Sequence, residues 1–441
     1  MSERDDAGVV VVGAGLGALR VAENLRTNGF DAPITLVGAE PYAPYDRPPL
    51  SKGVLLGTQD RPDLKPAAFY DDAAVTLRLT TRVTGIDTGA KELTARVGGA
   101  PGGRTASAGA TVAIRYGTLV LATGLTPRRF PGTEALAGVH VIRTFDDAAA
   151  LRAEIEGART AVVIGAGFIG CEVAASLTGR GLSVALVEPA PTPLAAALGE
   201  GIGRLVTRMH ERHGVDVRTG VAVAEIVGAG AGAGAGAVRA VRLADGTELP
   251  ADLVVVGIGS IPVTDYLDGS PIALAARESG GGIACDALGR VRASAATGDG
   301  QASAATGDGR ASAAGLVPDV FAVGDVANWA GPDGVPSRVE HWNHVVEQAS
   351  IVAGQIAGRP AVAASVPYFW SDQFEVKIQV LGRPRAEDTL HLVSDDGVKF
   401  LAYYSRDGIL TGVVGAGKVG AVMKTRAKLA TPTPIAELLS S

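Results

Sequence analysis

The feature that most constrains this chain is a glycine fingerprint that occurs twice, VVVVGAGLGA at Val9 to Ala18 and AVVIGAGFIG at Ala161 to Gly170. Each copy is an apolar run followed by Gly-x-Gly-x-x-Gly or Ala, which is typical of a buried parallel strand that turns sharply into a helix. The N–H groups at the start of such a helix can hold a pyrophosphate. Two copies therefore predict two nucleotide sites in one polypeptide.

An acidic residue after the next strand supports both sites. Glu40 follows the apolar run from Ile34 to Val37, and Glu188 follows the run from Val184 to Val187. A carboxylate at this position accepts hydrogen bonds from an adenosine ribose. The alternative is that an alanine-rich chain forms glycine clusters by chance. Because strand, turn, helix, strand and acid all recur in order, we favour two nucleotide sites.

Composition narrows the class of protein further. The 441 residues are 47% apolar and 20% charged, an ordinary globular balance for two or three domains. The net charge of −6 gives no reason to expect nucleic acid binding. The N-terminal MSERDDAG lacks a basic and apolar leader, so we expect a cytoplasmic protein. The apolar stretch at 161–179 contains Glu172, which favours strand plus helix over a membrane span.

The chain has few residues suited to thiol or metal chemistry. Its two cysteines, Cys171 and Cys285, form no C-x-x-C motif, so neither a disulfide reductase nor a cysteine-dependent peroxidase is expected. Its six histidines show no spacing typical of a metal site, and we expect no metal.

Strand and helix patterns alternate from Val9 onward, which predicts an α/β fold with two Rossmann-like nucleotide-binding domains. A proline-rich loop at 41–52 and an antiparallel hairpin at 75–114 interrupt the first domain. Beyond Pro367, four strand runs predict a C-terminal α+β domain with an antiparallel sheet and a terminal helix. We expect an FAD-binding domain at 1–143 and 268–340, an NAD-binding domain at 144–267 and a C-terminal interface domain at 341–441.

Three low-complexity segments interrupt these domains. They are a glycine-rich stretch at 98–110, an alternating glycine and alanine stretch at 228–237, and a nine-residue repeat at 292–315. Their composition is too poor in large apolar residues to form a core, so all three are interpreted as loops.

Several motifs together resemble the FAD-dependent NAD(P)H ferredoxin reductase family, of the putidaredoxin reductase, rubredoxin reductase and dioxygenase reductase type. Besides the two fingerprints, they are YDRPPLSK at 45–52, LATGLTPR at 121–128, VFAVGDVA at 320–327, EHWNHVVEQA at 340–349 and FWSDQ at 369–373. The resemblance implies a glutathione-reductase-like fold. It also implies hydride transfer from NADH to FAD, followed by transfer of single electrons to an iron–sulfur ferredoxin, with a rubredoxin as the alternative acceptor. The ferredoxin would serve a cytochrome P450 or a Rieske ring-hydroxylating oxygenase.

The resemblance places both cofactors on particular residues. The residues implied for FAD are Gly13, Gly15, Leu16, Ala18, Glu40, Arg47, Lys52, Val83, Ala122, Thr123, Gly124, Arg143, Gly324, Asp325 and Trp342. Those implied for NAD are Gly165, Gly167, Phe168, Ile169, Gly170, Glu188, Gly257 and Gly259. Glu188 would repel the 2′-phosphate of NADPH, and the following Pro189 and Ala190 supply no arginine to receive it, which favours NADH.

The resemblance also pairs Lys52 with Glu172 as the catalytic residues, because the matching lysine in the family lies near flavin N5. A cation there stabilises the negative charge of reduced flavin. Each role has a structural alternative: a solvated lysine for Lys52, a helix cap for Asp325 and a core aromatic for Trp342.

Two other functions stay open from the sequence. One is a rubredoxin reductase, and the other is an NADH-binding flavoprotein that acts mainly in redox sensing and protein interaction. For a reductase, we expect basic residues to dock an acidic ferredoxin, with scattered solvated charge as the alternative. These residues are Arg383, Arg385, Lys418, Lys424, Arg426 and Lys428.

Overall fold

The computed structural model describes residues 8–98, 109–230, 236–294, 315–331, 334–359 and 366–440. The chain forms two compact units. Unit 1 contains residues 1–46, 63–125 and 262–364, and unit 2 contains 47–62, 126–261 and 365–441. Among the helices in the described ranges, none combines the length and the apolar character that a membrane crossing requires.

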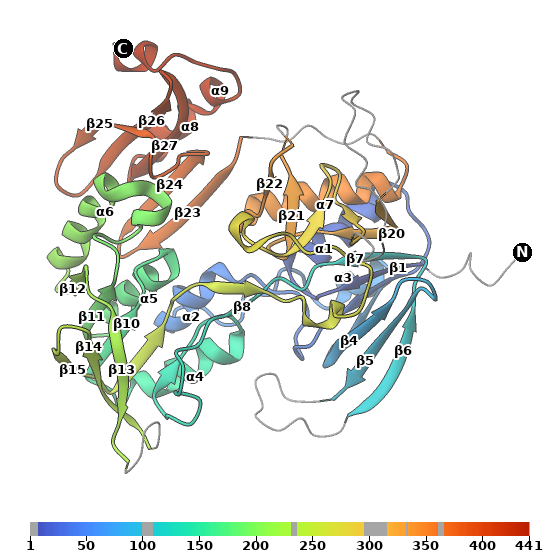
Figure 1. The fold of residues 1–441 in the computed structure, drawn as a ribbon, viewed down its shortest axis with the longest axis horizontal. Helices are drawn as coiled ribbons and strands as arrows, with labels where there is room; N and C mark the ends of the chain where they lie inside the picture. Colours follow the sequence, from blue (N-terminus) through green and yellow to red (C-terminus); the bar gives the residue numbers. More distant parts are fainter. Residues whose placement is uncertain are drawn as a thin grey trace, which may run out of the picture. The chain divides into compact units, whose positions relative to one another are not determined.

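Unit 1 is built on a nine-stranded sheet with the order β22-β21-β18-β19-β20-β7-β1-β2-β3 (Figure 1). Its strands are β1 (Val9–Val12), β2 (Ile34–Val37), β3 (Val75–Arg78), β7 (Thr118–Leu121), β18 (Ile283–Cys285), β19 (Arg290–Arg292), β20 (Leu316–Ala322), β21 (Ala327–Ala330) and β22 (Pro336–Ser337). Strands β20, β7, β1, β2 and β3 run parallel. All four valines of β1 are buried, as expected for a central parallel strand with both faces covered.

One expectation for this unit is wrong. Val75–Arg78 is not part of the antiparallel hairpin but the edge strand of the parallel sheet, paired with Ile34–Val37. The antiparallel element is a separate three-stranded sheet. Its strands are β4 (Thr81–Asp87), β5 (Glu92–Val97) and β6 (Ala110–Arg115). The first glycine-rich segment, at 99–108, lies outside the described residues.

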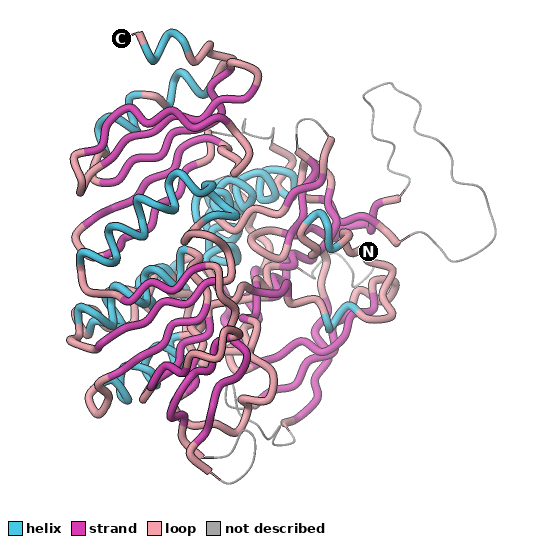
Figure 2. Tube along the Cα trace, turned by 60° about the vertical axis from the view of Figure 1, so that its left-hand side comes forward, coloured by secondary structure: helices cyan, strands magenta, loops and turns pink. Residues whose placement is uncertain are grey.

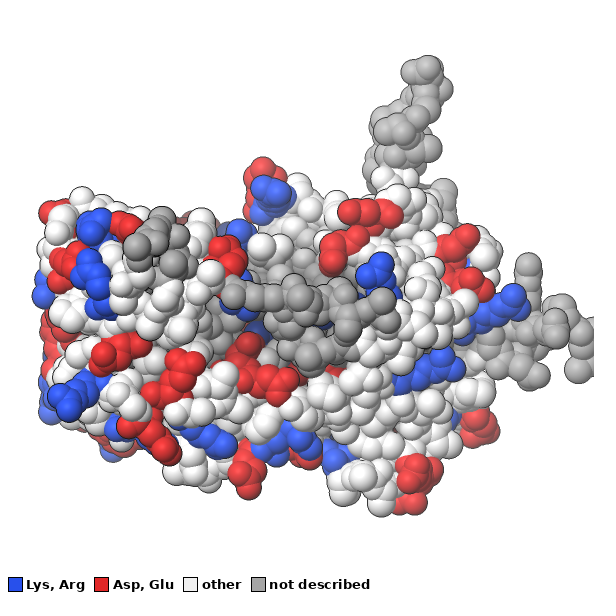
Figure 3. Space-filling model, turned by 90° about the horizontal axis from the view of Figure 1, so that it is seen from below, with Lys and Arg blue, Asp and Glu red and all other residues white. Residues whose placement is uncertain are grey.

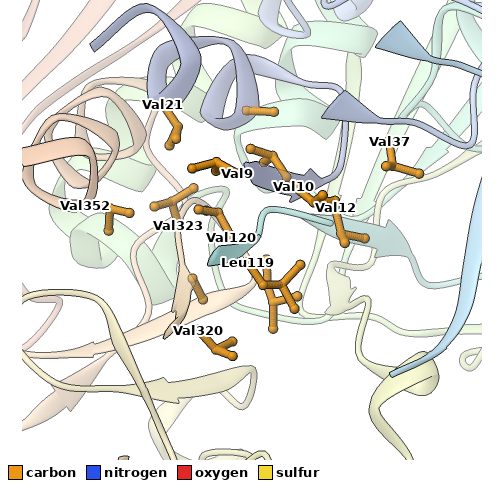
Figure 4. Packing of buried hydrophobic residues seen from close by; sticks show 14 of the residues in the cluster. Val9, Val10, Val12, Val21, Val37, Leu119, Val120, Val320, Val323 and Val352 are labelled. Atoms are coloured by element: carbon orange, nitrogen blue, oxygen red, sulfur yellow. The ribbon is translucent and has the colours of Figure 1, made fainter. Parts of the chain in front are cut away.

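Helices α1 (Leu16–Thr27) and α7 (Trp342–Ile356) pack against each other in unit 1. Figure 4 shows Val21 of α1 near Val9 and Val352 of α7 near Val323, and all four belong to one buried cluster. α7 therefore lies within unit 1, which extends to residue 364. The shorter helices of this unit are α3 (Ala68–Asp72), η2 (Asp265–Leu267) and η3 (Arg277–Ser279).

Unit 2 holds a second parallel sheet with the order β12-β11-β10-β16-β9. Its strands are β9 (Val139–His140), β10 (Thr160–Ile164), β11 (Ser183–Glu188), β12 (Asp216–Thr219) and β16 (Leu253–Val256). Its helices are η1 (Pro48–Ser51), α2 (Gly53–Leu56), α4 (Phe145–Ile155), α5 (Phe168–Gly179) and α6 (Ala195–Arg212). α4 begins with a capping box, in which Thr144 and Asp147 exchange hydrogen bonds with each other's backbone N–H.

A smaller antiparallel sheet lies beside the second parallel sheet. It has the strands β13 (Val223–Gly228), β14 (Val238–Leu243) and β15 (Glu248–Pro250). β13 and β14 pair antiparallel on either side of the alternating glycine and alanine stretch, of which 231–235 lie outside the described residues. β8 (Leu125–Pro127) and β17 (Ser260–Pro262) pair where the chain leaves and re-enters unit 1.

The C-terminal part of unit 2 is an antiparallel sheet with the order β23-β24-β27-β26-β25, drawn near the C label in Figures 1 and 2. Its strands are β23 (Tyr368–Gln373), β24 (Val376–Gly382), β25 (Thr389–Asp395), β26 (Phe400–Arg406) and β27 (Ile409–Ala416). Three short helices follow, α8 (Val419–Lys424), α9 (Arg426–Leu429) and α10 (Ala436–Leu439). The sheet thus has five strands where four were expected, because the first expected strand run contains both β23 and β24. In place of one expected terminal helix there are three short ones.

The described elements confirm the predicted fold class, two Rossmann-like sheets followed by an antiparallel C-terminal sheet. Most of the nine-residue repeat, at 295–314, lies outside the described residues, and its interpretation as a loop stays a prediction. On the face drawn in Figure 3, acidic and basic side chains are interspersed rather than gathered by sign.

Candidate active site

The first fingerprint forms a tight turn between β1 and α1 in unit 1. Gly13 has a φ of +119°, and a Cβ there would lie 2.2 Å from the carbonyl oxygen of Ala122, so only glycine fits. At Gly15, by contrast, no described atom lies within 4 Å of a built Cβ. Ala18 is fully buried one turn into α1. The turn is thus closed by its first glycine and open above its second, which leaves room for a phosphate at the helix N-terminus.

The second fingerprint repeats this arrangement between β10 and α5 in unit 2. Gly165 has a φ of +96°, and a Cβ there would lie 2.4 Å from the carbonyl oxygen of Gly257. Gly167 has no described atom within 4 Å of a built Cβ. A Cβ at Gly170 would lie 1.9 Å from the carbonyl oxygen of Gly165, so the third glycine lets the helix pack closely against the turn. Both turns fit a dinucleotide.

The acidic residue of the second turn is fixed in place by backbone donors. Glu188 ends β11, and its two carboxylate oxygens accept hydrogen bonds from the N–H groups of Ala166, at 2.7 Å, and Ala190, at 2.9 Å. The carboxylate therefore lies against the fingerprint turn itself. This places negative charge directly beside the second fingerprint turn.

The acidic residue of the first turn has a side-chain partner. Glu40 follows β2, and its carboxylate accepts a hydrogen bond of 2.5 Å from the hydroxyl of Tyr45, which is buried. Tyr45 is the first residue of the YDRPPLSK segment. The proline-rich loop therefore returns to the ribose side of the first turn.

The end of YDRPPLSK, from Arg47 to Lys52, lies in unit 2 and leads to a buried ionic cluster. Lys52 Nζ lies 3.0 Å from Glu172 Oε1 and 3.9 Å from Asp372 Oδ2. The Glu172 side chain is 6% exposed, and that of Lys52 is 16% exposed. Ser51 and Ser371 each donate a hydroxyl hydrogen bond of 2.6 Å to Glu172, one to each carboxylate oxygen. Glu172 thus has a donor on both oxygens in addition to the ammonium of Lys52.

Two short helices, η1 and α2, support this cluster. η1 and α2 hold the loop on α5, and the hydroxyl of Ser176 donates a hydrogen bond of 2.7 Å to the carbonyl oxygen of Ser51. Pro48 and Pro49 open η1, where the fixed φ of proline suits the first turn of a helix. The proline pair therefore positions Ser51 and Lys52 rather than only breaking the strand pattern.

The residues expected to hold FAD fall in both units. Unit 1 contains the largest set, Gly13, Gly15, Leu16, Ala18, Glu40, Val83, Ala122, Thr123, Gly124, Gly324, Asp325 and Trp342. Unit 2 contains Arg47, Lys52 and Arg143, and the guanidinium of Arg47 donates to the carbonyl oxygen of Arg143.

Within unit 1 these residues have different surroundings. The Trp342 indole donates a hydrogen bond of 2.9 Å to Asp46 Oδ1, and the Arg20 guanidinium lies 5.8 Å from its ring centroid. The N–H of Gly324 donates to the buried amide of Gln348 at 2.7 Å. Val83, in contrast, packs into the hydrophobic core.

The residues expected to hold NAD all lie in unit 2. Ile169 is 52% exposed at the start of α5, and Phe168 packs edge-on against Phe369 with ring centroids 5.0 Å apart. Gly259 has a φ of +91° and accepts a backbone hydrogen bond from Arg128. These groups line the same end of the sheet as the second turn, because β10 and β16 are parallel neighbours.

Three buried polar residues of these sites were not singled out from the sequence: Ser51, Ser371 and Gln348. Each lies inside a motif that carried the resemblance, YDRPPLSK, FWSDQ or EHWNHVVEQA. Their place inside these motifs was the only sequence feature that pointed to a role in the site. The motifs as a whole are specific to the family, whereas a single serine or glutamine is common in any chain.

The two cysteines are poor candidates for chemistry. Cys171 in α5 and Cys285 in β18 are buried free thiols. Burial raises the pKa of both thiols, and the neighbouring carboxylates of Glu172 and Asp286 add to the effect. Neither cysteine has the exposed, electropositive surroundings of a reactive thiolate.

Comparison with known proteins gives consistent matches over most of the chain. Residues 7–349 match the family model described as pyridine nucleotide-disulphide oxidoreductase, and residues 368–437 match the model described as reductase C-terminal. The chain is 35% identical over 407 residues to a ferredoxin–NAD(P)+ reductase from a Sphingomonas species, which covers 91% of this chain and 87% of the relative.

Two further matches extend over nearly the whole chain. It is 35% identical over 438 residues to rhodocoxin reductase from Rhodococcus erythropolis, covering 97% of this chain and 90% of the relative. The crystal structure of the covalent putidaredoxin reductase–putidaredoxin complex superposes with a TM-score of 0.84 at 27% identity, covering 99% of this chain and 96% of that one. The chain belongs to the pyridine nucleotide-disulphide oxidoreductase family.

Proposed function

We propose that this chain is an NADH-dependent ferredoxin reductase that binds FAD at the first turn and NADH at the second. It passes electrons one at a time to an iron–sulfur ferredoxin, which serves a cytochrome P450 or a ring-hydroxylating oxygenase. The observation that carries the proposal is the pair of open dinucleotide turns in a chain whose cysteines are both buried and free. Without a cysteine pair, electrons must leave directly for another protein.

The chain's own residues have distinct tasks in this function. The N-termini of α1 and α5 offer N–H groups to the two pyrophosphates. Lys52 supplies a fixed positive charge, and Glu172 holds that charge in position at 3.0 Å. Bound FAD would supply the chemistry that links a two-electron donor to a one-electron acceptor.

We propose NADH rather than NADPH as the donor. Both oxygens of Glu188 accept hydrogen bonds from backbone N–H groups, which hold the carboxylate against the second fingerprint turn. A 2′-phosphate placed against this fixed negative charge would be repelled.

We further propose three functional domains, one for FAD, one for NAD and one C-terminal interface domain, and a cytoplasmic location. Two free thiols fit a reducing compartment. The basic residues expected to dock a ferredoxin follow the end of β24 or lie at the N-cap of α8 and on α8 and α9. Both helices pack on β24 and β27. Beside them, Val419 and Met423 are 47% and 40% exposed. We propose this area, which combines basic residues with exposed apolar side chains, as the ferredoxin-docking surface.

The test is reconstitution of electron transfer with purified protein. After loading with FAD, the protein should reduce cytochrome c through an added ferredoxin, faster with NADH than with NADPH. Reduction of a rubredoxin alone would assign the protein to rubredoxin reduction. A protein that binds FAD and NADH but reduces neither acceptor nor a dye would reject the enzyme and favour the redox-sensing flavoprotein.

A further inference from the structure

The FWSDQ segment forms β23, and two of its polar side chains are completely buried. Ser371 and Gln373 are each 0% exposed and lie on the same face of the strand, since side chains alternate between faces. A buried hydroxyl and a buried amide each cost free energy unless they find hydrogen-bond partners. Their partners therefore indicate why polar residues occupy these positions.

Their partners form a continuous chain that ends on Glu172. His210 Nε2 of α6 lies 3.0 Å from Gln373 Oε1. Gln373 Nε2 donates to Ser371 Oγ at 3.1 Å, and Ser371 Oγ donates to Glu172 Oε1 at 2.6 Å. Glu172 in turn holds Lys52. The C-terminal sheet is thus connected to the ionic cluster by an unbroken row of buried polar groups.

The direction of donation along this chain is fixed by its chemistry. Burial lowers the pKa of His210 to about 4, so its ring is neutral near neutral pH. The amide oxygen of Gln373 can only accept, which puts the ring hydrogen on Nε2 of His210. Nδ1 of His210 then needs no acceptor, and it has no hydrogen-bond partner among the described residues. Because Ser371 accepts from Gln373, its own hydrogen is left for Glu172.

We propose that Ser371 and Gln373 are positioning residues of the active site, which direct a one-way chain of donors at Glu172 and so hold it as the acceptor for Lys52. This inference rests on the proposed function, in which Lys52 supplies charge at the flavin. It makes the C-terminal sheet a contributor to hydride transfer as well as to partner binding. Gln373 suits this task because one amide group both accepts from His210 and donates to Ser371.

The test compares variants along the chain in the FAD-loaded, full-length protein. Ser371→Ala and Gln373→Glu should each lower the rate constant of flavin reduction by NADH about tenfold or more, the expected effect of losing a hydrogen bond to a charged group. The dissociation constant for NADH and the FAD content should stay unchanged. Ser371→Thr, which keeps the hydroxyl, should restore the rate. Gln379→Leu, which changes another buried glutamine in the neighbouring strand, should leave the rate as in the wild type.

A double-mutant cycle separates action through Glu172 from a general packing defect. If Ser371 works through Glu172, Ser371→Ala should have no further effect on the rate in a Glu172→Gln background. An equal effect in both backgrounds would overturn the proposal. If the Ser371→Ala protein does not fold, Gln373→Leu replaces it in the cycle with Glu172→Gln. Gln373→Leu removes the donor to Ser371 but leaves the hydroxyl of Ser371 in place.

A spectroscopic readout is independent of turnover. Nitrogen-15 NMR of histidine-labelled protein should show His210 neutral with its hydrogen on Nε2, with or without FAD. A neutral His210 with its hydrogen on Nδ1 would contradict the direction of donation. Failure of the proposed function has a different signature, because the wild type itself would then not reduce its flavin with NADH.

Discussion

Replacing Gly167 by alanine separates nucleotide binding from folding. Gly167 has a φ of −71°, which any residue adopts, and no described atom lies within 4 Å of a built Cβ. The substitution should therefore change the free energy of unfolding by no more than about 0.5 kcal/mol. The new methyl group would occupy the space into which a pyrophosphate enters.

The size of the binding defect follows from that overlap. Forcing a methyl group into a packed contact costs about 1–3 kcal/mol. At about 1.4 kcal/mol for each tenfold change, NADH should bind about 5- to 150-fold more weakly. The FAD content should remain that of the wild type, because the first turn is untouched. Suitable assays are the KM for NADH in dye reduction and the Kd for NAD+ by calorimetry.

Two control variants make the result specific. Gly170→Ala should destabilise the fold itself, because its Cβ would lie 1.9 Å from the carbonyl oxygen of Gly165. Gly420→Ala in α8, another glycine with no described atom near a built Cβ, should alter neither stability nor NADH binding. A folded Gly167→Ala protein that binds NADH as well as the wild type would refute a pyrophosphate at this turn.

Further predictions concern the first turn, donor choice, pH and docking. Gly15→Ala should yield folded protein that purifies with little FAD, and full flavin content would argue against FAD at this turn. Glu188→Ser should raise kcat/KM for NADPH relative to NADH, and an unchanged ratio would count against repulsion by the carboxylate. Burial lowers the pKa of His210 to about 4, so between about pH 6.5 and 4 the unfolded chain binds a proton that the folded chain excludes. The unfolding free energy should thus fall as the pH drops, with up to about 3 kcal/mol from this residue, and denaturant titrations of His210→Gln should show less of that loss. Reversing the charges of Lys424 and Arg426 should raise the KM for ferredoxin at low salt but not at high salt, and an unaltered KM would remove these residues from the docking surface.

The strands and turns of both fingerprints could be predicted because their signals are local. A central parallel strand is a continuous apolar run, and a glycine with positive φ must follow it. The C-terminal strands were harder to delimit. β23 and β24 join through Phe374 with a φ of +54°, so neither glycine nor proline marks the turn between them.

Placements that depend on distant partners could not be predicted. Val75–Arg78 pairs with Ile34–Val37, about forty residues earlier, and its alternating pattern also suits an antiparallel hairpin. Ser371 and Gln373 meet Glu172 and His210, which are 199 and 163 residues away along the chain. Only the three-dimensional packing brings these groups together, so single residues of FWSDQ carried no such information.

The most direct test of the central claim is the stoichiometry of anaerobic electron transfer. FAD-loaded protein is mixed with limiting NADH and excess oxidised ferredoxin, and the loss of ferredoxin absorbance is recorded. Two ferredoxin molecules should be reduced for each NADH consumed. One hydride carries two electrons, whereas the iron–sulfur cluster of a ferredoxin accepts one electron at a time. NADH consumption that leaves the ferredoxin oxidised, or no oxidation of NADH at all, would contradict the account.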